Sequence, residues 1–213
     1  MPYTTVVLAD SPIAYWRLGE ASGTTAVDSS GHGRNGAYSG GVTKGVAGAL
    51  AYDSNTAALF DGSIGVVSVP DDSALRLNGS WSIEFWAKQV SYPHQFAGLI
   101  AKGSNQNGYS IWADPWGGLW LKRHNAEAGS GSGAIVSTGY RYFVVTYDGT
   151  NVKWYVDGVL KQTTAESFPG NGDPGQLQLG KGDVYGNNDI DEVALYATAL
   201  NATRIAAHYA SGH

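Results

Sequence analysis

The feature that most constrains the fold is a long series of short apolar and aromatic runs separated by Gly, Asn and Asp. No helical segments lie between the runs, which occupy residues 14–18, 58–60, 65–69, 81–90, 97–102, 108–113, 118–123, 141–163, 175–180 and 190–196. Short strands divided by turn residues are typical of antiparallel sheets packed in two layers. The sequence therefore predicts an all-β sandwich rather than a parallel α/β sheet.

The clearest hairpin spans residues 141–163. Within it, "DGTN" at 148–151 separates two alternating runs, and Asp157–Gly158 marks a second tight turn. Asp-Gly pairs favour the backbone conformations of tight hairpin turns. The glycine-rich patch "AEAGSGSGA" at 126–134 is interpreted as a mobile loop, because apolar strands lie on both sides of it. No linker divides the chain, so residues 1–213 are expected to form a single domain.

One short helix is expected near the end of the sequence, at residues 200–210. Asn201 is a good N-cap, and Leu200 and Ile205 occupy the two positions of a hydrophobic staple. This helix would close one edge or end of the sandwich.

Composition and charge exclude several classes of function. The chain has no cysteine, which removes disulfides, thiolate zinc sites and a cysteine nucleophile. The net charge is −5 and no basic run exceeds "KR" at 122–123, so a nucleic-acid partner is not expected. The first residues, "MPYTTVVLADSPIAYW", lack the pattern of a secretory signal, and no apolar stretch approaches the length of a membrane span.

Four stretches, taken in order, resemble the laminin-G-like and concanavalin-A-like jelly rolls. They are "SPIAYWRLGEASGTTAVDSSGHGRNGAY", "ALFDGSIGVVSVPDDSALRLNGSWSIEFWAK", "YRYFVVTYDGTNVKWYVDGVLK" and "NDIDEVALYATALNATRIAAHY". The resemblance implies a two-sheet antiparallel jelly roll whose first and last strands pair. Proteins of this superfamily include lectins, glycan-binding modules, adhesion domains, virion proteins and glycoside hydrolases. Function must therefore be argued from the site.

Three acidic residues at the head of the last strand could form a catalytic set. The glucanases of this superfamily carry Glu-x-Asp-x-Glu on one strand, which places all three acids on one face. Here Asp189 and Asp191 share a face by the period of two, whereas Glu192 is expected on the other face. Val193 takes the place of the third acid, so the sequence favours a non-catalytic protein.

The same strand offers a second possibility, a structural calcium ion. Calcium prefers several oxygen ligands from irregular loops, and "VDSSGHGRNG" at 27–36 has that character. The resemblance places this loop beside the last strand, where Asp28 and Asp191 would bind the ion with the His32 carbonyl and the Asn35 amide. In the alternative interpretation, Asp28 forms an Asx turn and Asp191 caps a loop by hydrogen bonds.

Aromatic residues on loops are the candidates for ligand binding, since sugars stack on aromatic faces and nearby amides bond their hydroxyls. Trp116 is the strongest, because "DPWGG" is a turn that needs no aromatic core residue. The other candidates are Tyr109, Trp112, Tyr92, His94, Tyr185 and Asn187. Tyrosine and tryptophan are also preferred at protein interfaces, so a protein partner stays an alternative.

The sequence thus predicts a non-catalytic glycan-binding or adhesion module with a structural calcium. Its expected partner is a carbohydrate or another protein surface, at an extracellular, cell-surface or virion location. The alternative is a structural protein of a phage virion that uses the fold for contacts within a larger particle. A glycoside hydrolase is a third and more distant interpretation.

Overall fold

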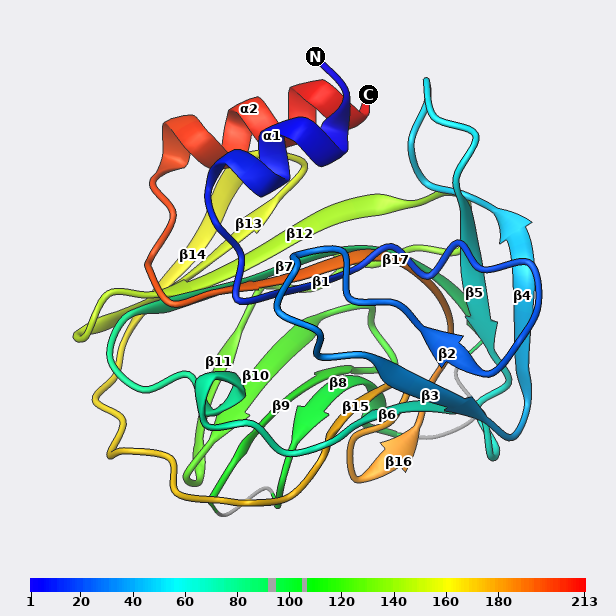
Figure 1. Cartoon of the computed structure of the whole chain (residues 1–213). Coiled ribbons are helices and arrows are strands. Elements are labelled where there is room, and N and C mark those ends of the chain that lie inside the picture. The colour runs from blue at the N-terminus through cyan, green and yellow to red at the C-terminus, as the bar shows by residue number, and fades with distance from the viewer. Residues whose placement is uncertain (92–94, 105–106) are drawn as a thin grey trace.

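Two sheets packed face to face form the body of the protein, and two helices lie over the outer face of one of them (Figure 1). The computed structural model describes residues 1–91, 95–104 and 107–213. Strand pairs within both sheets are antiparallel, except that β16 runs parallel to β8. The predicted two-sheet jelly roll with a short C-terminal helix is confirmed.

The first sheet has the strand order β14-β13-β12-β7-β17-β5-β4, with β1 paired to β17. Its strands are β1 (Ala14–Trp16), β4 (Val42–Ala47), β5 (Thr56–Phe60), β7 (Trp81–Ser91), β12 (Arg141–Tyr147), β13 (Asn151–Val156), β14 (Val159–Ala165) and β17 (Asn187–Tyr196). The β1–β17 pair joins the two ends of the chain, as the family resemblance implied.

The second sheet has the strand order β11-β10-β9-β8-β15-β6-β3-β2, with β16 beside β8. Its strands are β2 (Thr25–Ala26), β3 (Gly36–Ser39), β6 (Val66–Val69), β8 (Ala97–Lys102), β9 (Tyr109–Ala113), β10 (Leu119–Arg123), β11 (Ala126–Gly129), β15 (Leu177–Leu179) and β16 (Val184–Tyr185). A short 3₁₀ helix, η1 (Ser73–Arg76), precedes β7.

The central strands of the first sheet are buried on both of their faces. Phe85 of β7 points between the sheets and stacks on Phe143 of β12 at 5.3 Å between ring centroids. Its neighbour Trp86 points the opposite way and packs under the helices, where Tyr142 lies 5.2 Å from it. Two apolar layers explain why the central strands carry large apolar residues at consecutive positions.

Two helices supply the outer layer. Helix α2 (Ala202–Gly212) begins at the predicted cap, where the Asn201 side chain accepts a hydrogen bond from the Arg204 backbone N–H. Helix α1 (Tyr3–Ala9) was not predicted, because the β-branched residues in "YTTVVLA" have low intrinsic helix propensity. It forms where it can bury Tyr3, Val6 and Val7 against α2 and the sheet, so packing overrides propensity. Within the described residues no helix is long and apolar enough to cross a membrane.

The local sequence predictions are confirmed where the alternation was strong. The 141–163 run forms β12, β13 and the start of β14, with turns at the two predicted Asp-Gly sites. The interpretation of 126–134 as a mobile loop was wrong in its first half, since residues 126–129 form the edge strand β11. Small side chains allow this pairing, because a Cβ added at Gly129 would lie only 3.1 Å from the ring of Trp120.

Candidate functional site

The acidic residues of β17 form a buried network with other parts of the chain. Asp189 makes an ion pair with Lys88 at 2.6 Å. Asp191 and Glu192 are fully buried, and the Asn55 amide lies within hydrogen-bond distance of both carboxylates, at 3.3 and 3.1 Å. Arg17 completes the network with an ion pair to Glu192 at 2.9 Å.

The expectation that Glu192 points away from Asp191 was wrong. A β-bulge interrupts the pairing of β17 with β7 between Asp191 and Ala194, and Glu192 adopts a left-handed backbone with φ of 52°. A bulge breaks the alternation of side chains along a strand, so both carboxylates reach Asn55. Burial, and then the charge of Glu192, raise the pKa of Asp191 well above its usual range.

The Asp28 carboxylate is held by hydrogen-bond donors from its own loop and from β1. Its Oδ1 accepts from the Tyr15 N–H at 3.0 Å and the Ser30 N–H at 2.9 Å, and its Oδ2 accepts from the Arg34 N–H at 2.9 Å. Burial raises the pKa of Asp28, but the bonds from Ser30, Tyr15 and Arg34 outweigh it and hold the pKa below the usual range. The bond to Ser30 is the Asx turn of the alternative interpretation.

These residues do not fit a calcium ion. The Asn35 amide oxygen accepts from the Asp28 N–H at 2.8 Å, and Asp191 accepts from the Ala49 N–H at 2.8 Å. His32 is exposed. Across residues 1–91, 95–104 and 107–213, no three His, Cys, Asp or Glu side chains are grouped to hold a metal. Calcium therefore stays a prediction that this geometry does not support.

The predicted ligand residues occupy different environments. Trp116 is 73% exposed at the tip of the β9–β10 hairpin. Trp112 is nearly buried, stacked on Trp120 with 5.7 Å between centroids. Tyr109 is buried and its hydroxyl donates to the Leu75 carbonyl, so it does not face a ligand.

The remaining candidates that the structure describes, Tyr185 and Asn187, contact other parts of the chain. Tyr185 is half-buried beneath the Lys181 ammonium, which sits 4.8 Å from its ring centroid. Asn187 donates to the Ser91 hydroxyl at 2.8 Å. Tyr92 and His94 lie outside the described residues.

A cleft of about 370 Å³ adjoins the β9–β10 hairpin where the edges of the two sheets meet. It is lined by Asp114, Trp120, Glu127, Gly129, Gly131, Ser132, Gln162 and Thr164. Glu127 comes from β11 and Gln162 and Thr164 come from β14, the edge strands of the second and first sheets. Sequence reasoning missed these three polar residues, because only the stacking of the two sheets brings them together.

Asp114 fixes the hairpin beside the cleft. One carboxylate oxygen accepts from the backbone N–H groups of Trp116 and Gly118, each at 2.8 Å. The other accepts from the Trp120 indole N–H at 2.8 Å. The turn that presents Trp116 and the indole that lines the cleft are thus held by one side chain.

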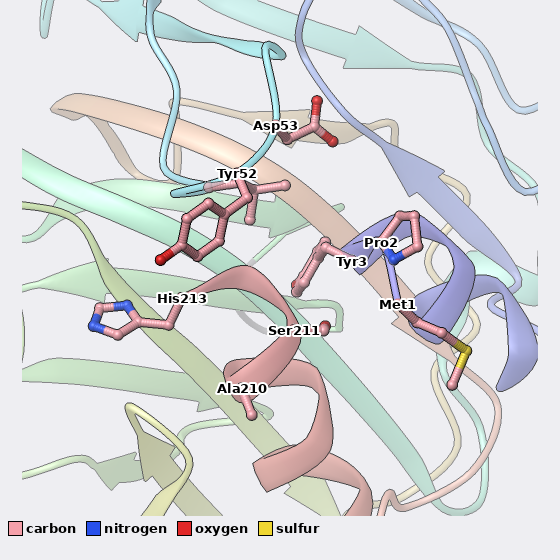
Figure 2. A pocket seen from close by; sticks show the side chains of 9 residues that line it. Met1, Pro2, Tyr3, Tyr52, Asp53, Ala210, Ser211 and His213 are labelled. Carbon is pink, nitrogen blue, oxygen red and sulfur yellow. The ribbon is translucent and has the colours of Figure 1, made fainter.

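A second hollow, of about 470 Å³, lies where the two ends of the chain meet. Figure 2 shows Tyr52 between Tyr3 and His213, with Met1 and Pro2 beyond Tyr3. The carboxylate in its lining, Asp53, is paired with Arg17 at 2.7 Å. Because Arg17 also pairs with Glu192, the Asp53 carboxylate belongs to the β17 network. This hollow is therefore a weaker candidate for a ligand site than the cleft beside the β9–β10 hairpin.

Comparisons with known proteins agree with this architecture. The binding domain of botulinum neurotoxin DC in complex with rat synaptotagmin II has a TM-score of 0.74 and 18% identity, covering 97% of this chain and 52% of that chain. A second structure comes from botulinum neurotoxin type C, whose cell entry is described as dependent upon interaction with two ganglioside molecules. It has a TM-score of 0.75 and 20% identity, and the match covers 99% of this chain and 53% of that chain. The botulinum neurotoxin DC binding domain in complex with SialylT has a TM-score of 0.72 and 18% identity, covering 97% and 52%.

This chain spans about half the length of those structures, and identities this low establish a shared fold alone. A search of curated protein sequences gave no match. A laminin-G-type sequence profile, described as the concanavalin A-like lectin/glucanases superfamily, matches residues 61–206, which is more than half of the chain. The chain therefore belongs to the concanavalin A-like lectin/glucanase superfamily.

Proposed function

We propose that this protein is a non-catalytic glycan-binding module whose site is the β9–β10 hairpin and the adjoining cleft. The observation that carries the proposal is the 73% exposure of Trp116 beside a cleft with polar walls. Tryptophan is highly buried on average, so an indole exposed beside a cleft with polar walls supports a binding surface. An aromatic platform with a few placed polar groups is the usual construction of a small-molecule site.

Hydrogen bonds hold the turn and the Trp120 ring in place before a ligand arrives. The three hydrogen bonds that Asp114 accepts fix both the Trp116 turn and the Trp120 ring. A preformed platform loses little conformational entropy on binding, which favours affinity. The sugar ring would stack on Trp116, while Gln162 and Glu127 would hydrogen-bond its hydroxyls.

The carboxylates support binding rather than hydrolysis. Glycosidases need two carboxyl groups flanking the scissile bond, one able to give up or take a proton. In the cleft, Asp114 is occupied by three N–H donors, and Glu127 pairs with Lys122 at 3.4 Å. The acids of β17 are buried in their own network and do not line the cleft.

The similar structures are consistent with this function and with an extracellular or cell-surface location. They include binding domains described with gangliosides, with SialylT and with synaptotagmin.

The test is a glycan array with the wild-type protein and Trp116→Ala. We expect binding to at least one glycan class and a loss of about tenfold or more in the variant, as for an interface hot spot. Tyr52→Ala is the matched control, because Tyr52 is 91% exposed at the other hollow. Wild-type protein that binds no glycan, or a Trp116→Ala variant that binds as well as wild type, contradicts the proposal.

A second candidate function is structural contact with another protein, including assembly into a phage particle. Strand β14 is the edge of the first sheet, and it exposes Val159 (57%) and Leu160 (48%). Exposed apolar edge strands are sites of pairing with other chains. Leu160→Lys should then weaken association with purified particles, whereas a monomer that is absent from particles argues against this function.

A further inference from the structure

Arg123, the last residue of β10, is a buried cation without an acidic partner. Its side chain is 2% exposed, and Nη1 donates to the Leu77 carbonyl at 2.9 Å. Its Nε has no hydrogen-bond partner among the described residues, and in the same part of the chain it forms no ion pair. Residues 92–94 and 105–106 contain no Asp or Glu.

The unpaired buried charge of Arg123 lowers the stability of the folded state. A buried charge is normally paired, because desolvation costs more than the remaining contacts return. Two aromatic rings give partial compensation, since the guanidinium carbon lies 5.4 Å from the Phe168 centroid and 5.9 Å from that of Trp81. Burial still lowers the pKa of Arg123, which is the sign of a charge that its surroundings do not balance.

Arg123 lines a cavity of about 300 Å³. The walls come from three segments: residues 78–79 after η1, the β12–β13 turn, and the loop at 167–170. Tyr147 joins two of these, because its hydroxyl donates to the Gly149 carbonyl at 2.9 Å and accepts from the Phe168 N–H at 3.2 Å. The cavity therefore has a fixed aromatic wall beside the guanidinium.

We propose that this cavity binds the carboxylate of a small acidic ligand, with Arg123 as the residue that recognises it. Nη1 donates to the Leu77 carbonyl and the buried Nε has no partner, so the guanidinium keeps unused N–H groups, whose planar arrangement matches a carboxylate. No Lys contributes to the cavity lining, so a singly charged group suits it better than a doubly charged phosphate. The carboxylate could belong to an acidic sugar or to a small organic acid.

This site is separate from the proposed glycan site. Arg123 ends β10, whereas Trp116 lies before its first residue, Leu119. The two sets of lining residues share no member. Binding at Arg123 is therefore expected to survive Trp116→Ala.

The test is calorimetric titration and thermal unfolding of the full chain with sodium glucuronate, sodium acetate and glucose. The titrations are repeated in the Trp116→Ala variant, which removes the proposed glycan site. In that variant glucuronate should bind and raise the Tm, as any ligand of the folded state does, whereas neutral glucose of the same ring size should not. Glucuronate that binds more tightly than acetate identifies an acidic sugar as the source. Equal affinity for glucuronate and acetate shows that the cavity recognises the carboxylate alone. Either of these two results supports the proposed site at Arg123.

Arg123→Met is the principal variant and Lys122→Met is its matched control, since Lys122 is the adjacent, partly exposed residue of β10. We expect Arg123→Met to weaken carboxylate binding by about tenfold to a hundredfold, the value of hydrogen bonds to a charged group. Without ligand its Tm should equal or exceed that of the wild type, because an apolar side chain replaces an unpaired buried charge.

If Arg123→Met does not fold, Arg123→Lys keeps the charge but removes the fork, and it should still weaken binding. Three results overturn the proposal. These are no binding of either carboxylate by the wild type, binding of glucose equal to that of glucuronate in the Trp116→Ala variant, or unchanged carboxylate affinity in the folded Arg123 variant.

Discussion

We expect His208 to make the stability of the outer layer of this protein dependent on pH. The imidazole is fully buried in α2, with Nδ1 2.8 Å from Glu84 and Nε2 2.7 Å from Asp10. A neutral imidazole has one N–H, so only the protonated form can donate to both carboxylates. Burial lowers the pKa of His208, but the bonds to Glu84 and then Asp10 outweigh it and raise the pKa above its usual value.

The groups around His208 determine whether stability falls or rises with pH. Glu84 also accepts from the hydroxyls of Tyr3 at 3.1 Å and Tyr142 at 2.9 Å, and Asp10 pairs with Arg204 at 2.8 Å. Because the folded pKa is raised, the stabilisation is complete below the unfolded pKa of about 6.5. It is lost as pH rises through the folded pKa, at about 1.4 kcal/mol for each pH unit between the two values.

The perturbation is His208→Gln, which can donate from one amide nitrogen but carries no charge. Removing one partner of a buried ionic network costs about 3–5 kcal/mol, so the variant should be less stable by that amount below pH 6.5. The difference from wild type should shrink as pH rises from about 6.5 to the folded pKa, and it should stay constant above that pKa. Urea unfolding followed by tryptophan fluorescence, at a series of pH values, measures both quantities.

His32→Gln is the control, because His32 is exposed and its replacement should change the free energy of unfolding at no pH. The reasoning is refuted if the difference between wild type and His208→Gln stays below about 1 kcal/mol, the scale of exposed pairs. It is also refuted if that difference does not change with pH.

Three further outcomes test the fold. Asn201→Ala removes the cap of α2 and should lower the free energy of unfolding by about 1 kcal/mol, whereas Asn201→Gly should cost only a few tenths; equal losses would contradict the capping argument. Gly180 has a φ of 81°, and a Cβ at this position would lie 2.1 Å from the buried ring of Phe60. Gly180→Ala should therefore lower the free energy of unfolding in urea by about 2–5 kcal/mol. An unchanged free energy would show that Phe60 can move. EDTA should leave the Tm unchanged, because Asp28 is already satisfied by N–H donors; a lower Tm would restore the calcium site.

The strands that the sequence predicted are buried on one face, which gives an alternating pattern, or on both faces, which gives a continuous apolar run. The 97–102 run was placed correctly, because every residue of β8 is buried. Strand β4 was missed, since "VTKGVA" exposes alternate residues and contains a glycine at a bulge. The pairing of β1 with β17 is a long-range contact, and only the family resemblance predicted it.

A site residue could be placed from the sequence where a single segment determines its position, but not where several segments do. The exposure of Trp116 could be predicted, because a turn residue has no core to fill. The burial of Tyr109 also follows from the sequence once β9 is recognised, because Tyr109 shares its face with Ile111 and Ala113 and not with Trp112. The joining of Glu127 with Gln162 requires the stacking of two sheet edges, which no local pattern encodes.

The acids of β17 show why a strand pattern alone cannot decide between an enzyme and a binding module. A strict period of two separates Asp191 from Glu192, yet the bulge brings both to Asn55. Proximity, the geometric precondition for a catalytic pair, is thus met. Function still does not follow, because both carboxylates are fully buried and Arg17 neutralises one of them. What excludes them from contact with a substrate is access, and access is determined by the loop that carries Asn55 and by the pairing with β7.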